Sequence, residues 1–224
     1  MSDLPAVKIL HVIGSARAEG TPHLVLQWLG ASGPIQEVLA LRDHPADLEL
    51  QLRSGAHWYH ALSTMPTGKV KFPWMVLAVS RICRARRPDI VVCWHNGFSS
   101  AVLLGARIAG IRCLLTHGGN PPTLTWGGRL YTVYTTFMLR ILGAKMVCCS
   151  RYVEWEFASL PGVSNSVLTT VFNCVAVDRI AAKAAEARSK RVDATRRIIM
   201  VATLEPHKDH ATLLRAMVDV QRKI

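Results

Sequence analysis

The chain has 224 residues, half of them hydrophobic, which is enough for one large domain or one and a half ordinary ones and excludes a largely disordered protein. The formal net charge is +12, and residues 50–153 contain thirteen Lys and Arg but a single acidic residue, Asp89. We therefore expect an anionic partner near this stretch: a phosphorylated small molecule, an anionic membrane surface or nucleic acid. A solvated basic surface would give the same pattern.

The N-terminal segment lacks the charged start, apolar stretch and cleavage site of a secretory signal, and no apolar segment reaches the roughly 18 residues needed to span a bilayer. We expect a cytoplasmic protein with at most peripheral contact with the inner face of the membrane. The cysteines lack paired metal-ligand spacing and lie mostly in apolar runs, so the sequence predicts buried thiols in a reducing compartment. They are Cys83, Cys93, Cys113, Cys148, Cys149 and Cys174.

Apolar runs of strand length alternate with helical patterns along the chain. Several runs are apolar at nearly every position, as in strands covered by helices on both faces. The expected strands are 8–13, 35–41, 89–94, 111–116, 144–150, 167–172 and 198–204. The expected helices are about 22–31, 71–87, 99–109, 128–142, 151–160 and 209–222. This alternation predicts an α/β, Rossmann-like fold with a doubly wound, mostly parallel sheet.

The segment 173–197 differs from the rest of the chain, because it is alanine-rich, highly charged and without a strand-length apolar run. We interpret it as a connector with a helical piece. Residues 1–172 then form one Rossmann-like domain, and residues 198–224 start a second one. A single strand and helix cannot bury a core by themselves.

The helix expected at 71–87 mixes apolar residues such as Phe72 and Trp74 with five Lys and Arg. It could lie on an anionic membrane surface. Packing of its apolar side on the sheet, with the charges exposed, is the commoner arrangement for such a pattern.

A loop from Gly14 to Gly20 links the first strand to a helix, for which Thr21 can serve as N-cap before Pro22. Backbone N–H groups in such a loop and the helix N-terminus can face an anion. The loop lacks the GxGxxG dinucleotide fingerprint and the GK[ST] of a P-loop. A simple strand-to-helix turn is therefore the alternative.

Two polar clusters, His95-Asn96 and His117-Gly118, fall at the ends of expected strands. Ligands of open α/β sheets bind beyond the carboxyl ends of strands, so these histidines are placed where a site belongs. An imidazole there can hydrogen-bond a phosphate or a sugar hydroxyl, or act on a proton near neutral pH. The alternative is a structural role. No third ligand with suitable spacing accompanies them, so we expect no metal.

Lys208 lies just before the last expected helix, near the positive end of its dipole. Together they could hold a diphosphate and stabilise the negative charge that develops on it as a leaving group. Taken alone, a solvent-exposed loop lysine is the simpler interpretation.

The order of these segments resembles the glycosyltransferases of family 4. The matching segments are KILHVIGS with its glycine loop, RPDIVVCWHNGFSSAVLLGARIAGIRCLLTHGG, GAKMVCCSRYVEWEF, VFNCVAVDRI and IIMVATLEPHKDHATLLRA. The resemblance implies a GT-B enzyme, in which two Rossmann-like domains face each other across a cleft. It implies a retaining sugar transfer from a nucleotide-sugar donor, with no obligatory metal and no cofactor. The N-terminal domain would mainly bind the acceptor and the C-terminal domain the nucleotide.

The resemblance also implies roles for individual residues. Gly20 and Thr21 would lie near the donor diphosphate, and Lys208 would bind the donor phosphates. His117 matches the family histidine that faces the transferred sugar or the acceptor, which makes it the expected catalytic residue. The expected acceptor-binding residues are His95, Asn96 and Gly118.

The sequence departs from the family pattern at three places. Ala202-Thr203 replaces the usual GR pair, Cys174 replaces the glycine of NGV, and the glutamate-rich donor site would follow residue 224. We therefore expect a transferase-like protein of polysaccharide or glycolipid biosynthesis, with a glycan or lipid-linked acceptor, that is inactive as this chain alone.

Other readings of the sequence remain open. A second chain could complete the donor domain, or the protein could be a non-catalytic remnant that binds an acceptor or partner. The missing GxGxxG disfavours a dinucleotide-dependent oxidoreductase. Nucleic-acid binding rests on charge alone and is not expected.

Overall fold

The computed structural model describes residues 6–17, 20–42, 48–123, 125–173, 175, 177–189, 198–202, 204 and 208–222. The chain divides into two compact units, Met1–Ala176 and Val177–Ile224, and each is described by itself.

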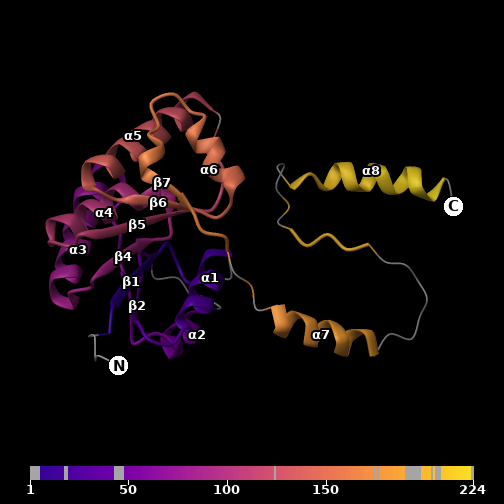
Figure 1. The fold of residues 1–224 in the computed structure, drawn as a ribbon, viewed down its shortest axis with the longest axis horizontal. Helices are drawn as coiled ribbons and strands as arrows, with labels where there is room; N and C mark the ends of the chain where they lie inside the picture. Colours follow the sequence, from indigo (N-terminus) through magenta and orange to yellow (C-terminus); the bar gives the residue numbers. More distant parts are fainter. Residues whose placement is uncertain are drawn as a thin grey trace. The chain divides into compact units, whose positions relative to one another are not determined.

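The first unit is built on a seven-stranded sheet whose strand pairs are all parallel. The order across the sheet is β3-β2-β1-β4-β5-β6-β7 (Figure 1). The strands are β1 Lys8–Ile13, β2 Ile35–Ala40, β3 Trp58–Ala61, β4 Ile90–Cys93, β5 Cys113–Gly118, β6 Lys145–Cys148 and β7 Leu168–Thr170. The order reverses between β1 and β4, which makes their carboxyl ends the switch point where ligands of such sheets bind.

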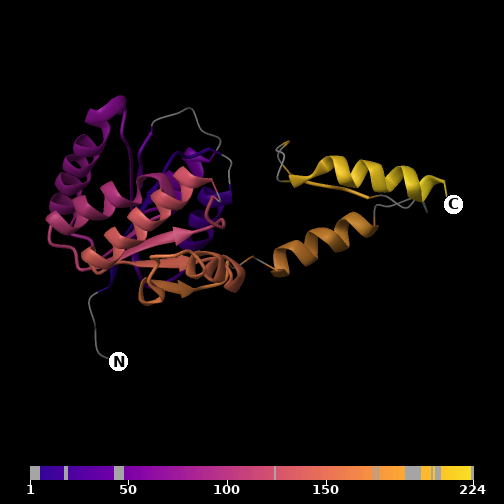
Figure 2. The same cartoon turned by 90° about the horizontal axis from the view of Figure 1, so that it is seen from above.

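Helices cover both faces of this sheet, with α1 and α2 on one side and α3, α4 and α5 on the other (Figures 1 and 2). The helices of the first unit are α1 Gly20–Leu29, α2 Glu49–Gly55, α3 Lys71–Arg86, α4 Ser99–Ile108, α5 Trp126–Leu142 and α6 Arg151–Ala158. Short 3₁₀ turns lie at Gly68–Val70, Asn96–Phe98 and Asn165–Val167. The expected Rossmann-like α/β fold is therefore confirmed.

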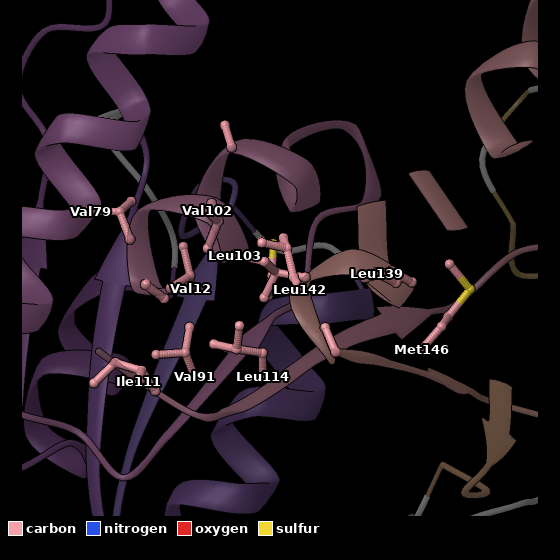
Figure 3. Close-up of a cluster of buried hydrophobic side chains, with 14 of the residues drawn as sticks. Val12, Val79, Val91, Val102, Leu103, Ile111, Leu114, Leu139, Leu142 and Met146 are labelled. Carbon is pink, nitrogen blue, oxygen red and sulfur yellow. The ribbon is translucent and has the colours of Figure 1, made fainter. Parts of the chain in front are cut away.

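Two core clusters follow from the alternation of side chains along the strands. Leu10 and Val12 of β1 belong to the larger cluster, which they share with residues of α3, α4 and α5. Figure 3 shows Val12 beside Val79 of α3 and Val102 of α4. Ile13 belongs to the smaller cluster, on the side of α1 and α2. Because both faces are buried, strands such as these are apolar at nearly every position.

The helix expected at 71–87 packs on the sheet. Met75, Val79 and Cys83 of α3 are buried in the larger core, and Trp74 is half-buried against it. Its C-terminal end is held by Arg86, whose guanidinium donates hydrogen bonds to Glu37, a carboxylate buried on β2. These hydrogen bonds give the buried Glu37 carboxylate a charged partner and anchor the C-terminal end of α3.

The sequence did not predict β3 and α2. The WYHA segment is short, lies at the edge of the sheet and carries an exposed histidine, so it lacks the apolar run of the other strands. The first helix begins at Gly20, which places Thr21 inside its first turn instead of at the expected N-cap position.

The second unit contains α7 Val177–Ser189 and α8 His210–Gln221. The prediction of a strand at 198–204 is wrong for the described residues of this segment. They form no strand, and residues 198–202 are exposed. A strand exists only when it pairs with another, and one apolar run cannot supply that partner. Thr203 and the segment 190–197 lie outside the described residues. None of the described helices is long and apolar enough to cross a membrane.

Close contact between α3 and α4 depends on Gly105. A Cβ atom there would lie 2.6 Å from the backbone oxygen of Val76, which is shorter than any ordinary contact. We expect Gly105→Ala to lower the free energy of unfolding by about 1–3 kcal/mol, because the two helices must move apart. Urea denaturation followed by circular dichroism measures the change.

Gly127→Ala is the matched control, since Gly127 also lies in a helix but has no atom near its Cβ position. It should be neutral or slightly stabilising. Equal stability of the Gly105→Ala and wild-type proteins would contradict the prediction.

Candidate functional site

The switch point of the sheet carries a pocket of ≈ 180 Å³. Its lining residues come from the loop after β1, the start of α1, the end of β2 and the loop after β4. They are Gly14, Ser15, Arg17, Thr21, Pro22, Arg42, Trp94, His95 and Phe98. The pocket thus brings together Thr21, expected near the donor diphosphate, and His95, expected to contact the acceptor.

Gly14 is required by this arrangement. A Cβ atom at this position would lie 2.5 Å from Cδ2 of His95. Any side chain here would displace the imidazole. The His95 ring is otherwise fixed by two contacts: its Nδ1 accepts a hydrogen bond from the backbone N–H of Gly97, and it stacks on Phe98 with 4.5 Å between centroids.

Asn96 lies between this pocket and a second one of ≈ 240 Å³, which it lines together with Asn120 and Tyr131. The backbone oxygen of Asn96 accepts a hydrogen bond from the Tyr131 hydroxyl at 2.9 Å. Its side-chain Oδ1 is buried and has no hydrogen-bond partner among the described residues.

His117 is the second-last residue of β5, where it is buried and in register with Val147 of β6. Its ring centroid is 4.9 Å from that of Trp94. Nε2 is buried and forms no hydrogen bond with a described residue. Burial lowers the pKa of the His117 imidazole, and Asn173 opposes this shift. The side chain is therefore neutral at pH 7, with one ring nitrogen uncommitted.

A chain of buried hydrogen bonds, which the sequence analysis missed, holds Trp94 in place. The indole N–H of Trp94 donates to Nδ1 of His11 at 3.0 Å. The tautomer is thereby fixed, so Nε2–H of His11 donates to Oε1 of Gln36, whose amide in turn donates to the backbone oxygen of Trp28. The sequence feature that could have indicated these hydrogen bonds is the single histidine within the apolar strand KILHVI.

Two arginines of the 180 Å³ pocket were also missed. Arg17 lies in the expected glycine loop, and Arg42 follows β2. Both are exposed, and the described residues that line the pocket include no acidic residue. The pocket is therefore suited to an anionic group.

Of the expected site residues in the first unit, four do not line this pocket: Gly20, Asn96, His117 and Gly118. Gly20 begins α1 and has no atom near its Cβ position, so space does not demand glycine there. Gly118 is buried, and a Cβ on it would lie 3.3 Å from the side chain of Met146, so packing explains the glycine. Lys208 belongs to the second unit, where it lies in a short turn before α8. Among the described residues no group of three His, Cys, Asp or Glu could hold a metal ion.

Comparisons with known proteins find similarity in structure but not in sequence. No protein-family model and no curated protein matches the chain. Anabaena HepE in complex with UDP matches with a TM-score of 0.63 at 12% identity, over 82% of this chain and 50% of that one. A glycosyltransferase from Rickettsia africae matches with a TM-score of 0.60 at 14% identity, over 85% of this chain and 51% of that one. A UDP-N-acetylglucosamine 2-epimerase from Rickettsia bellii matches with a TM-score of 0.53 at 8% identity, over 84% of this chain and 50% of that one.

The chain has the Rossmann-like α/β fold found in GT-B glycosyltransferases. It spans about half the length of these structures. At such low identity the likeness concerns the fold alone, so the expected membership of family 4 and the expected activity stay proposals.

Stability should fall in acid because of His11. Burial lowers the pKa of His11 from 6.5 to about 4, so the unfolded chain binds a proton more readily than the folded one below pH 6.5. The free energy of unfolding should therefore decrease as the pH falls from 6.5 to about 4, by up to about 3 kcal/mol, and His117 acts in the same direction. Urea titrations between pH 4 and 8 measure this slope.

A His11→Gln variant should be less stable at pH 7 but should show a weaker pH dependence. His60→Gln, changed at an exposed imidazole of β3, is the control and should keep the wild-type slope. The same slope in the His11→Gln variant and the wild type would contradict the assignment.

Proposed function

We propose that this chain is the acceptor side of a retaining, family 4-like glycosyltransferase, together with the start of its nucleotide-binding domain. The enzyme would transfer a sugar from a nucleotide-sugar to a glycan or lipid-linked acceptor in polysaccharide or glycolipid biosynthesis. The observation that carries the proposal is the pocket at the β1/β4 switch point, where the glycine loop, Trp94 and His95 meet. His117 does not line this pocket but contacts the ring of Trp94 behind it. The structures of HepE with UDP and with UDP-glucose support a nucleotide-sugar as the donor.

His117 is the proposed catalytic contact to the transferred sugar. A neutral imidazole can hydrogen-bond a sugar hydroxyl without introducing a charge, and its uncommitted Nε2 is available for this. The contact between the Trp94 and His117 rings orients the imidazole, and the His11 hydrogen bond fixes Trp94. Trp94 and His11 therefore act as positioning residues.

Each of the two units carries a candidate group for the donor phosphates. Thr21 in the first turn of α1, with Arg17 beside it, supplies a helix N-terminus and a cation from the first unit. Lys208 would act from the second domain.

Cells in which only the chromosomal codon is changed test the catalytic role, because whatever completes the enzyme stays in place. Membranes from such cells are incubated with radiolabelled UDP-sugars, and label in glycan and lipid fractions is counted. The transferase activity of the protein is taken as the part of the incorporated label that is lost when its gene is deleted. His117→Ala should reduce it about 100-fold or more, as expected for loss of a contact made in the transition state.

His60→Ala is the control and should leave incorporation unchanged, with protein levels compared by immunoblot. Full activity of the His117→Ala strain would remove His117 from the mechanism. Deletion of the gene could instead leave the incorporation from every nucleotide-sugar unchanged. That result would favour the alternative function, a non-catalytic protein that binds an acceptor or a partner.

The exposed side of helix α5 supports an acceptor that lies at a membrane surface. Large apolar side chains recur every three or four residues along α5 and are exposed, whereas such a stripe normally faces a core. They are Trp126, Leu130, Tyr134, Phe137 and Ile141. The charged residues of this helix are Arg129 and Arg140, with no acidic residue among them. A stripe that combines aromatic and basic residues suits an anionic lipid surface.

Vesicle flotation tests this contact with the purified chain. Vesicles that contain phosphatidylglycerol should bind the protein, and pure phosphatidylcholine vesicles should bind it less. Trp126→Ser/Phe137→Ser should weaken partitioning at least about tenfold, because two large apolar side chains no longer enter the lipid. Val7→Ser/Leu50→Ser, two exposed apolar residues elsewhere, is the control. Equal binding of both double variants would exclude α5 as the contact.

A further inference from the structure

A second basic pocket lies beyond the carboxyl ends of β2 and β3, beside the site already described. Its volume is ≈ 380 Å³. It is lined by Arg42, Leu62, Ser63, Met65, Pro66, Thr67, Gly68 and Lys71. Arg42 follows β2, Leu62 and Ser63 follow β3, and Lys71 begins α3, so three separate segments contribute. Among the described residues, this lining includes two cations and two hydroxyls but no carboxylate.

Phe98 holds the two cations at this place. Nζ of Lys71 lies 4.3 Å from the centroid of the Phe98 ring, and Cζ of Arg42 lies 5.6 Å from the same centroid. Both distances are within the range of cation–π attraction. The ring is itself held by stacking on His95. The side chains are therefore gathered at a defined position and do not merely extend into solvent.

Two like charges beside one ring repel each other, and an anion between them would relieve the repulsion. In the described part of the first unit, the acidic partners in ion pairs are Glu37 and Glu49. Those pairs involve Lys8, Arg53 and Arg86, and neither Arg42 nor Lys71 takes part. Within the described residues, the pair of cations thus has no internal counterion.

We propose that this pocket binds a phosphoryl group of the acceptor. Two cations with nearby hydroxyls of Ser63 and Thr67 match the charge and the hydrogen-bond acceptors of a phosphate or diphosphate. Arg42 lines both pockets, so the phosphoryl group lies on one side of it and the reacting sugar on the other. The assignment to the acceptor rests on the proposed function, but the binding of phosphate does not.

The phosphoryl group can come from a soluble sugar phosphate or from a lipid. A neighbouring pocket of ≈ 260 Å³, lined by Lys71, Phe72, Phe98, Tyr131 and Tyr134 among others, leads from the cations to the aromatic residues of α5. A lipid-linked phosphate could place its headgroup at Lys71 and its apolar part along this neighbouring pocket. The experiment therefore includes one arm for each source.

Titration calorimetry of the purified 224-residue chain with inorganic pyrophosphate at pH 7 tests the subsite. Arg42→Gln/Lys71→Gln should weaken binding at least about tenfold, through loss of two charge-assisted contacts. Arg112→Gln/Lys145→Gln is the matched control: it removes the same charge from exposed residues beside the opposite ends of the strands, and should change binding less than about twofold. Arg42→Lys/Lys71→Arg, which keeps the charges, should retain most of the binding and shows that the site tolerates substitution.

No measurable binding, or an equal loss in the glutamine and control variants, would overturn the subsite. The second arm adds phosphatidylglycerol vesicles to the pyrophosphate titration. Weaker pyrophosphate binding to the wild-type chain in the presence of the vesicles identifies a lipid phosphate as the ligand, and unchanged pyrophosphate binding identifies a soluble one. Failure of this experiment leaves the sugar transfer measured with the His117→Ala strain untouched, so the two proposals fail separately.

Discussion

The need to cover a parallel sheet on both faces governs the rest of this structure. Helices occupy both faces of the sheet, and the central strands are buried between two layers of side chains. All seven strands therefore send their carboxyl ends to one edge, where the loops are free to carry polar residues. The reversal of strand order between β1 and β4 separates the helices at that edge. The glycine loop, His95 and His117 meet there because of this topology.

The site is connected to the core by polar groups that have no contact with solvent. His11 accepts from Trp94 and donates to Gln36, which uses both ring nitrogens and requires the neutral imidazole. Burial of His11 enforces that state by lowering its pKa to about 4. Trp94 then presents its ring to His117 in a fixed orientation. The geometry at the edge of the sheet thus depends on a hydrogen-bond chain within it.

Six strands could be predicted because each falls within an apolar run of strand length, and several of these runs are apolar at nearly every position. The edge strand β3 could not, since WYHA is short and pairs on one side only. The opposite error occurred at 198–202, where an apolar run that predicts a strand is exposed and unpaired. Pairing is a property of two segments, so the pattern of one segment does not decide it. The buried side of α3 followed its apolar pattern, whereas the exposed aromatic stripe of α5 did not.

The sequence by itself determined the fold class, the alternation of strands and helices, and the histidines at the ends of β4 and β5, because these depend on local periodicity and on strand ends. Only the tertiary structure placed His11 under Trp94 and gathered Arg42 and Lys71 around Phe98. These residues are far apart in the chain and carry no shared motif. Their proximity follows from the strand order and from the close packing of α3 on α4, which no local pattern encodes.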